Sequence, residues 1–149
     1  MRSTIQNNTP MKKFYVILIT LFAINAANAQ SDQVCLSCLT EGIVFYNQSQ
    51  IDNFQTNYPN CTQIEGNVLI SGNGITNLNG LNVLTSIGGN LTISSTGNLY
   101  SLSGLNNLIY VGHDLGIRSN SALNSLAGME SLDSIGLAFE IRYNPTRQI

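Results

Sequence analysis

The chain has 149 residues, of which 43% are apolar and only 9% are charged, and its formal net charge is −2. This composition excludes a disordered chain, which would carry more charge and fewer aliphatic side chains. Beyond Lys13 only three arginines stand against eight acidic residues. The basic surface that nucleic acid or an anionic membrane requires is therefore missing. At this length we expect a single domain.

The N-terminal residues predict a secretory signal. Starting at Met11, two lysines are followed by an apolar run over 14–24 and by the small-x-small pattern of 27–29, which indicates cleavage after Ala29. The apolar run is too short for a membrane span, which needs about 20 residues. Residues 1–10 are polar, and we interpret them as an upstream extension outside the real protein. We expect an exported product, secreted, at the cell surface or in the periplasm, without a membrane span after cleavage.

Three cysteines follow the signal, and an exported protein meets an oxidising environment. Cys35 and Cys38 form a C-x-x-C pattern, which elsewhere indicates a redox dithiol or half of a zinc site. A zinc site needs about four ligands, and besides these only Cys61 and His113 are available. No strand-helix-strand context supports a redox motif. We therefore expect a structural disulfide, for which Cys38 with Cys61 is the favoured pair and Cys35 is left over.

Residues 30–63 predict an N-terminal cap made of a strand and a helix. The run 43–46 has high β-propensity. Ser49 as N-cap with Asp52 three residues later approximates a capping box, and Pro59 would end the helix. One helix face would be apolar, with Ile51, Phe54 and Tyr58. Such a face must be buried against something else, so we expect the cap to cover the open end of the repeats that follow.

From Ile64 the sequence repeats in units of 23, 24 and 24 residues, followed by a partial unit from Ile135, so the repeats occupy 64–149. This period is typical of solenoids, in which each repeat forms one coil. Seven apolar columns recur, and we expect them to face inward. Three of them are Ile64, Ile87, Val111, Ile135; Val68, Leu91, Leu115, Phe139; and Ile70, Ile93, Ile117, Ile141. The alternation predicts strands with one buried face, which stacking would pair in a parallel sheet.

These patterns resemble a known family. The register N-C-T-x-I-x-G-N-V-x-I over 60–70, followed by units of L-x-G-L-x-x-L-x-x-I-G-G-x-L-x-I, resembles the receptor L domain, a leucine-rich-repeat-like fold. It is most similar to secreted versions common in the Bacteroidota, where a C-L-x-E-G-I cap like that of 38–43 precedes the repeats. The resemblance implies a mainly β, right-handed parallel β-solenoid of about three and a half coils. It supports the pairing of Cys38 with Cys61 and implies recognition without shared catalytic residues.

The last unit departs from the repeat. Arg147 occupies the column of Leu99 and Leu123, and the sequence ends at Ile149 before the remaining columns recur. The polar cap of a terminal repeat is not recognisable. One hypothesis is therefore that the chain is a truncated fragment or structural spacer of a longer surface protein, with no ligand of its own.

Candidates for catalysis are few. His113 is the only histidine and precedes Asp114, but adjacent residues on a strand point to opposite faces, so we do not expect an acid–base dyad. Asp114 shares a column with Asn67, Asn90 and Ala138, which we interpret as a solvated polar ladder. No phosphate-binding loop or set of metal ligands is recognisable. We expect no enzyme activity and no cofactor.

The outward strand positions form two further columns: Leu69, Thr92, Gly116, Glu140; and Ser71, Ser94, Arg118, Arg142. Solenoids use extended surfaces of this kind for recognition. Arg118, Glu140 and Arg142 are the only strong charge cluster and are the candidate ligand face; the alternative is a solvated face that keeps the sheet soluble. We expect a non-catalytic recognition or adhesion module that binds a protein or glycan at the cell surface, of unknown oligomeric state.

Overall fold

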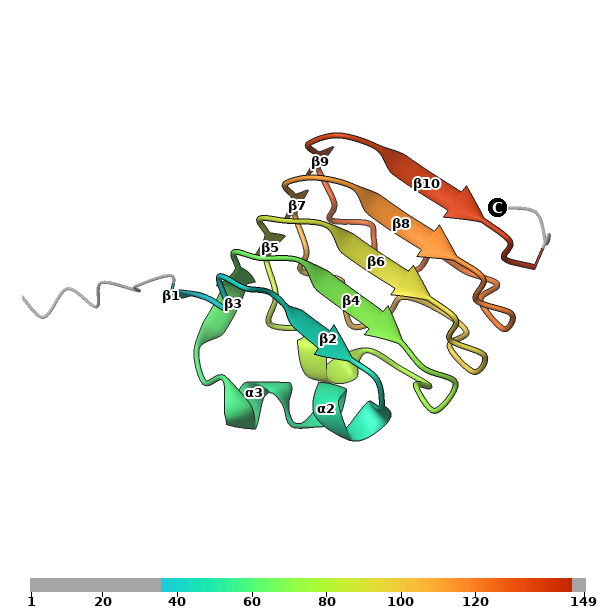
Figure 1. Ribbon diagram of the computed structural model, residues 1–149, viewed down its shortest axis with the longest axis horizontal. Helices are drawn as coiled ribbons and strands as arrows, with labels where there is room; N and C mark the ends of the chain where they lie inside the picture. Colours follow the sequence, from blue (N-terminus) through green and yellow to red (C-terminus); the bar gives the residue numbers. More distant parts are fainter. Residues whose placement is uncertain (1–35, 146–149) are drawn as a thin grey trace, which may run out of the picture. The chain divides into compact units, whose positions relative to one another are not determined.

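The computed structural model describes residues 36–145, which lie within one compact unit. Ten short strands alternate along the chain between two five-stranded sheets, and all neighbouring strands are parallel (Figure 1). Sheet A has the order β1-β3-β5-β7-β9, and sheet B has the order β10-β8-β6-β4-β2. This part of the chain is mainly β, as the sequence predicts. The predicted signal, Cys35 and Arg147 lie outside the described residues.

The strands of sheet B are longer than most strands of sheet A. Sheet A contains β1 (Leu36–Cys38), β3 (Cys61–Ile64), β5 (Ser86–Ile87), β7 (Tyr110–Val111) and β9 (Ser134–Ile135). Sheet B contains β2 (Ile43–Phe45), β4 (Val68–Ser71), β6 (Leu91–Ser94), β8 (Leu115–Arg118) and β10 (Phe139–Arg142). Aliphatic residues alternate with outward-facing residues along β4, β6 and β8, the period of two that places one face on a core.

The strand register is the one that the repeat columns predict. Along sheet B, Ile70 pairs with Ile93, Ile93 with Ile117, and Ile117 with Ile141. Along sheet A, Ile64 pairs with Ile87, which pairs with Val111. Each residue therefore stacks on its counterpart one repeat later, which keeps the apolar columns together.

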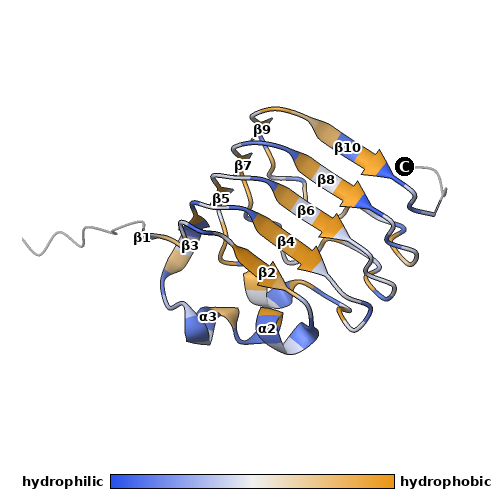
Figure 2. Ribbon diagram, in the orientation of Figure 1, coloured by the Kyte–Doolittle hydropathy of each residue, from blue (hydrophilic) through white to orange (hydrophobic). Residues whose placement is uncertain are grey.

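The predicted columns form one hydrophobic core between the two sheets. All their members from Ile64 to Leu123 are buried, and the hydropathy colouring of Figure 2 shows apolar positions repeated at the same place in successive strands of sheet B. In the last repeat the columns are only partly buried, at Leu126, Met129, Leu132, Ile135 and Ile141. Phe139 is 53% exposed although it shares the column of Leu91 and Leu115.

The N-terminal cap also continues both sheets. β1 pairs with β3, and β2 pairs with β4 in the register Ile43 to Val68 and Phe45 to Ile70. After β2, two short helices, α2 (Gln48–Asp52) and α3 (Phe54–Asn57), contact the 3-10 helix η1 (Asn79–Leu81) of the next repeat. Their apolar side chains Ile51 and Phe54 are buried, as the sequence predicts. Residues 36–60 thus form the outermost rung of both sheets.

The predicted N-cap of the helix is wrong. Asn47 caps α2: its side chain accepts the N–H of Gln50 at 3.0 Å, and the Gln50 side chain accepts the N–H of Asn47 at 3.3 Å. The helix starts earlier than expected because the chain leaves β2 at Phe45 and turns at once. It is also divided at Asn53, whose side-chain amide donates to the carbonyl of Ser49 at 2.8 Å.

A disulfide joins Cys38 in β1 to Cys61 in β3, with 5.8 Å between the two Cα atoms. This is the favoured pair of the sequence analysis. Glycine supports close stacking elsewhere: Gly104 and Gly128 take φ values of 111° and 109°, and an added Cβ would clash with the carbonyls of Leu78 and Leu102. The disulfide and these glycines hold successive repeats at a fixed spacing.

Candidate functional site

The candidate site lies on the outer face of sheet B, which changes character from β2 to β10. At the β2 end, Val44 continues the column of Leu69, and Tyr46 is 62% exposed just beyond the strand. The middle strands carry small hydroxyl side chains, Ser71, Thr92 and Ser94. The charged residues of the cluster come only from β8 and β10. The face therefore runs from apolar through small polar to charged.

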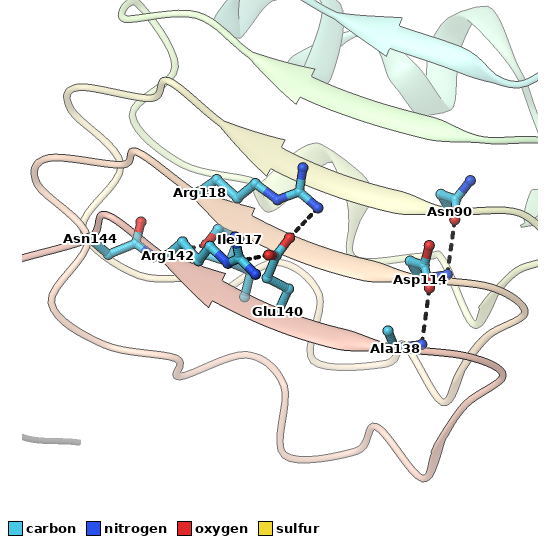
Figure 3. Close-up of polar contacts among 8 residues, drawn as sticks. All are labelled: Asn90, Asp114, Ile117, Arg118, Ala138, Glu140, Arg142 and Asn144. Carbon is cyan, nitrogen blue, oxygen red and sulfur yellow. Dashed lines mark hydrogen bonds and ion pairs between the residues drawn. The ribbon is translucent and has the colours of Figure 1, made fainter.

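Arg118, Glu140 and Arg142 form one connected group on this face (Figure 3). The Nη2 atom of Arg118 pairs with Oε2 of Glu140, and the Nε atom of Arg142 pairs with Oε1. Each carboxylate oxygen thus has its own guanidinium. The carboxylate side chain is 24% exposed, whereas the arginine side chains are 50% and 64% exposed. The structure brings together the three residues that the sequence singled out.

Gly116 lies beneath the Arg118 guanidinium in this arrangement. Glu140 pairs in register with Gly116, and Arg142 with Arg118, so Arg118 must reach back along β8 to meet the carboxylate. A Cβ added at Gly116 would lie 3.4 Å from Nε and 3.5 Å from Nη2 of Arg118. The guanidinium therefore lies flat over the glycine. Sequence analysis gave Gly116 no role, although it is the one glycine among the outward positions of the five sheet B strands.

The cluster contributes little to stability but has distinct binding chemistry. Exposed ion pairs are worth at most about 1 kcal/mol each, because water and salt screen them. The two guanidinium groups and one carboxylate carry a net positive charge, and Arg142 keeps most of its surface exposed. Arginine donors suit carboxylate, sulfate and phosphate groups, which they can bind in a bidentate way.

The predicted ladder through Asp114 is present and is structural. The side-chain oxygen of Asn67 accepts the N–H of Asn90 at 2.8 Å. That of Asn90 accepts the N–H of Asp114 at 2.9 Å, and that of Asp114 accepts the N–H of Ala138 at 3.0 Å (Figure 3). His113 contributes backbone groups to neighbouring repeats. Asp114 thus serves the backbone of the next repeat.

A second ladder, which the sequence did not reveal, lies beyond the ends of the sheet B strands, with Thr96 and Asn120 buried. The side-chain oxygen of Asn120 accepts the hydroxyl of Thr96 at 2.7 Å, and its amide donates to the carbonyl of Ile93 at 3.0 Å. Asn144 repeats this pattern one rung later and donates to the carbonyl of Ile117 at 2.9 Å. Polar residues at one column position, just after each strand, were the signal that could have shown it.

Among residues 36–145 no group of three or more His, Cys, Asp or Glu side chains could hold a metal ion. None of the helices in that same range has the length and apolar character needed to cross a membrane.

The receptor L domain family model matches residues 60–141, which is more than half of the chain. The chain belongs to the receptor L domain family. No curated protein and no solved structure gives a significant match. Within this receptor L domain, the matched range includes Arg118 and Glu140 and ends one residue before Arg142. Membership supports a ligand-binding, non-catalytic module and, together with the disulfide, an extracellular setting.

Proposed function

We propose that this receptor L domain is an exported recognition or adhesion module that binds a protein or glycan through the outer face of sheet B. Arg118, Glu140 and Arg142 form the centre of the binding surface. The proposal includes export by a signal cleaved after Ala29. It also includes a right-handed, leucine-rich-repeat-like solenoid with 23 or 24 residues per coil, of the type secreted by Bacteroidota.

One observation carries the proposal: the two guanidinium groups are held by a single carboxylate, with Arg118 laid over Gly116. A charged face that only served solubility would not need to hold two arginines on one half-buried carboxylate. A positioned guanidinium loses less conformational freedom on binding than a freely rotating one, so a preorganised pair raises affinity.

The charge of the cluster favours an acidic ligand. The chain has a net negative charge, so these arginines are a local positive feature on an acidic protein. Glycans with carboxylate or sulfate groups carry hydroxyls that can hydrogen-bond to Ser71 and Ser94, and anionic groups that can bind the arginines. An acidic protein surface offers the same anions without the hydroxyls.

The test is a binding assay with the purified protein against acidic polysaccharides, neutral polysaccharides and acidic proteins. We expect saturable, salt-sensitive binding to acidic glycans, and a loss of affinity of about tenfold in Arg118→Ala and in Arg142→Ala. Glu65→Gln is the matched control for Glu140→Gln, because both remove one carboxylate. The control should bind normally, whereas Glu140→Gln should change the affinity because it releases both arginines.

Two results would overturn the proposal. Binding that survives both arginine variants would show that the ligand uses another surface. Failure of every probe to bind would favour the spacer hypothesis. Circular dichroism on each variant checks that the fold persists, which we expect because these side chains are exposed.

A further inference from the structure

The outer edge of β10 carries backbone groups with no partner among the described residues, because β10 ends the order of sheet B. In the preceding repeats the equivalent N–H groups donate to a carbonyl of the following repeat. The N–H of Leu91 donates to the carbonyl of Asp114, and the N–H of Leu115 donates to that of Ala138, both at 2.9 Å. By the same pattern the N–H of Phe139 faces away from β8. Because backbone direction alternates along a strand, Ile141 also presents its backbone groups to this edge.

The same edge borders an exposed apolar surface. Leu137 is 72% exposed and Phe139 is 53% exposed, and Ile141 is only partly buried. An edge strand that combines free backbone groups with apolar side chains is a template for pairing with another chain.

We propose that a second copy of this chain pairs with the β10 edge, antiparallel and around a two-fold axis at Ile141. In this register Glu140 lies opposite the partner's Arg142, and Arg142 lies opposite the partner's Glu140. The two copies thus make two opposite-charge pairs on one face of the joined sheet, and Ile141 meets its own counterpart on the other face. This inference does not depend on the proposed ligand.

The charged side chains favour this register over the registers shifted by one or two residues. A shift of two residues in one direction places Glu140 opposite the partner's Glu140, and a shift in the other direction places Arg142 opposite the partner's Arg142. Like charges directly opposite each other on antiparallel strands are destabilising, whereas opposite charges stabilise the pair. A shift of one residue would place apolar and charged side chains on the wrong faces.

Charge also favours a two-fold dimer over head-to-tail stacking. The other edge strand of sheet B is β2, whose outward residue is Val44. Stacking β10 on β2 of another copy would give Glu140 and Arg142 no charged partner on that copy and would propagate into a filament. Antiparallel pairing uses the same patch on both copies and closes after two.

Sedimentation equilibrium over a wide range of concentrations tests the assembly. We expect a concentration-dependent dimer with no larger species. Glu140→Arg alone and Arg142→Glu alone should each weaken dimerisation about tenfold or more, because two opposite-charge pairs become two like-charge pairs. The double exchange, Glu140→Arg with Arg142→Glu, should restore it. Arg118→Ala removes a neighbouring charge outside the edge strand and should leave the dimer unchanged.

Disulfide trapping tests the register in a Cys35→Ala background. Two residues that exchange hydrogen bonds across antiparallel strands lie about 5.5 Å apart at Cα, within the range of a disulfide. Ile141→Cys should therefore form a covalent dimer on mild oxidation. Glu140→Cys should not, because it lies diagonal to its counterpart at about 7–8 Å.

Three outcomes would overturn the dimer: a monomer at all concentrations, a series of species beyond the dimer, or a double exchange that fails to restore association. Equal trapping of Ile141→Cys and Glu140→Cys would overturn the register. Loss of ligand binding in Arg118→Ala with an intact dimer would support the dimer as an interaction that does not depend on the ligand.

Discussion

Both edge strands of sheet B carry an inward-facing phenylalanine, yet the two side chains differ in burial. Phe45 in β2 is 1% exposed, because Phe54 of α3 packs against it with 5.9 Å between ring centroids. Phe139 in β10 is 53% exposed, and no described helix lies against it. A position in an apolar column therefore determines that a side chain points inward. Its burial also requires that a neighbouring element packs over it.

The largest difference between the two edges should appear when each phenylalanine is truncated. Phe45→Ala should lower the free energy of unfolding by about 4 kcal/mol, because it leaves a cavity between β2 and α3. Phe139→Ala should cost only about 1 kcal/mol, because half of that side chain is already in water. Urea unfolding of both variants measures the two values. Similar losses would contradict the idea that the helical cover makes the difference.

A smaller difference in stability is expected between variants of Asn120, in the middle of the second ladder, and variants of Asn144, at its last rung. Asn120→Ala should destabilise by about 2 kcal/mol, since it leaves the buried Thr96 hydroxyl and the Ile93 carbonyl without their partner. Asn144→Ala should cost less than about 1 kcal/mol, because its contacts are only part-buried. Thermal unfolding compares the pair, and the reverse order would show that the last rung is the more constrained.

The smallest effect concerns the start of the helical cover. Asn47→Ala should destabilise by about 1 kcal/mol, because it removes the acceptor for the Gln50 N–H. Ser49→Ala is the control, since Ser49 lies inside α2 and does not cap it. Urea unfolding measures both variants. A larger loss of stability in Ser49→Ala than in Asn47→Ala would indicate that Ser49 is the N-cap.

The repeat part of the fold could be predicted because its signal is periodic. Ile70, Ile93, Ile117 and Ile141 recur at nearly constant spacing, and this spacing alone determines which residues pair. The pairing of β2 with β4 was not predicted, because the spacing between these two strands is longer than that between later strands and a helix replaces the loop. Yet Glu41-Gly42 before β2 matches Glu65-Gly66 before β4, and that local match was visible in the sequence.

The candidate site could be predicted as a list of residues but not as an arrangement. The columns placed Arg118, Glu140 and Arg142 on one face, because strand alternation determines the direction of each side chain. They could not show that Arg118 folds back over Gly116, since a long side chain chooses among many rotamers according to its neighbours. The N-cap of α2 could not be predicted for a related reason. Asn47 and Ser49 are both good N-cap residues, and the position at which β2 ends decides between them.

The exposed ladder from Asn67 to Ala138 has a direction, because each side chain serves the backbone of the following repeat. A repeat inserted or deleted as a whole brings or removes one acceptor together with one donor, so the hydrogen bonds still balance. The ladder stops at Ala138, whose methyl group has no acceptor to offer. Insertion or deletion of a whole repeat therefore leaves the hydrogen bonds of this ladder balanced, and the ladder ends where Ala138 supplies a donor but no side-chain acceptor.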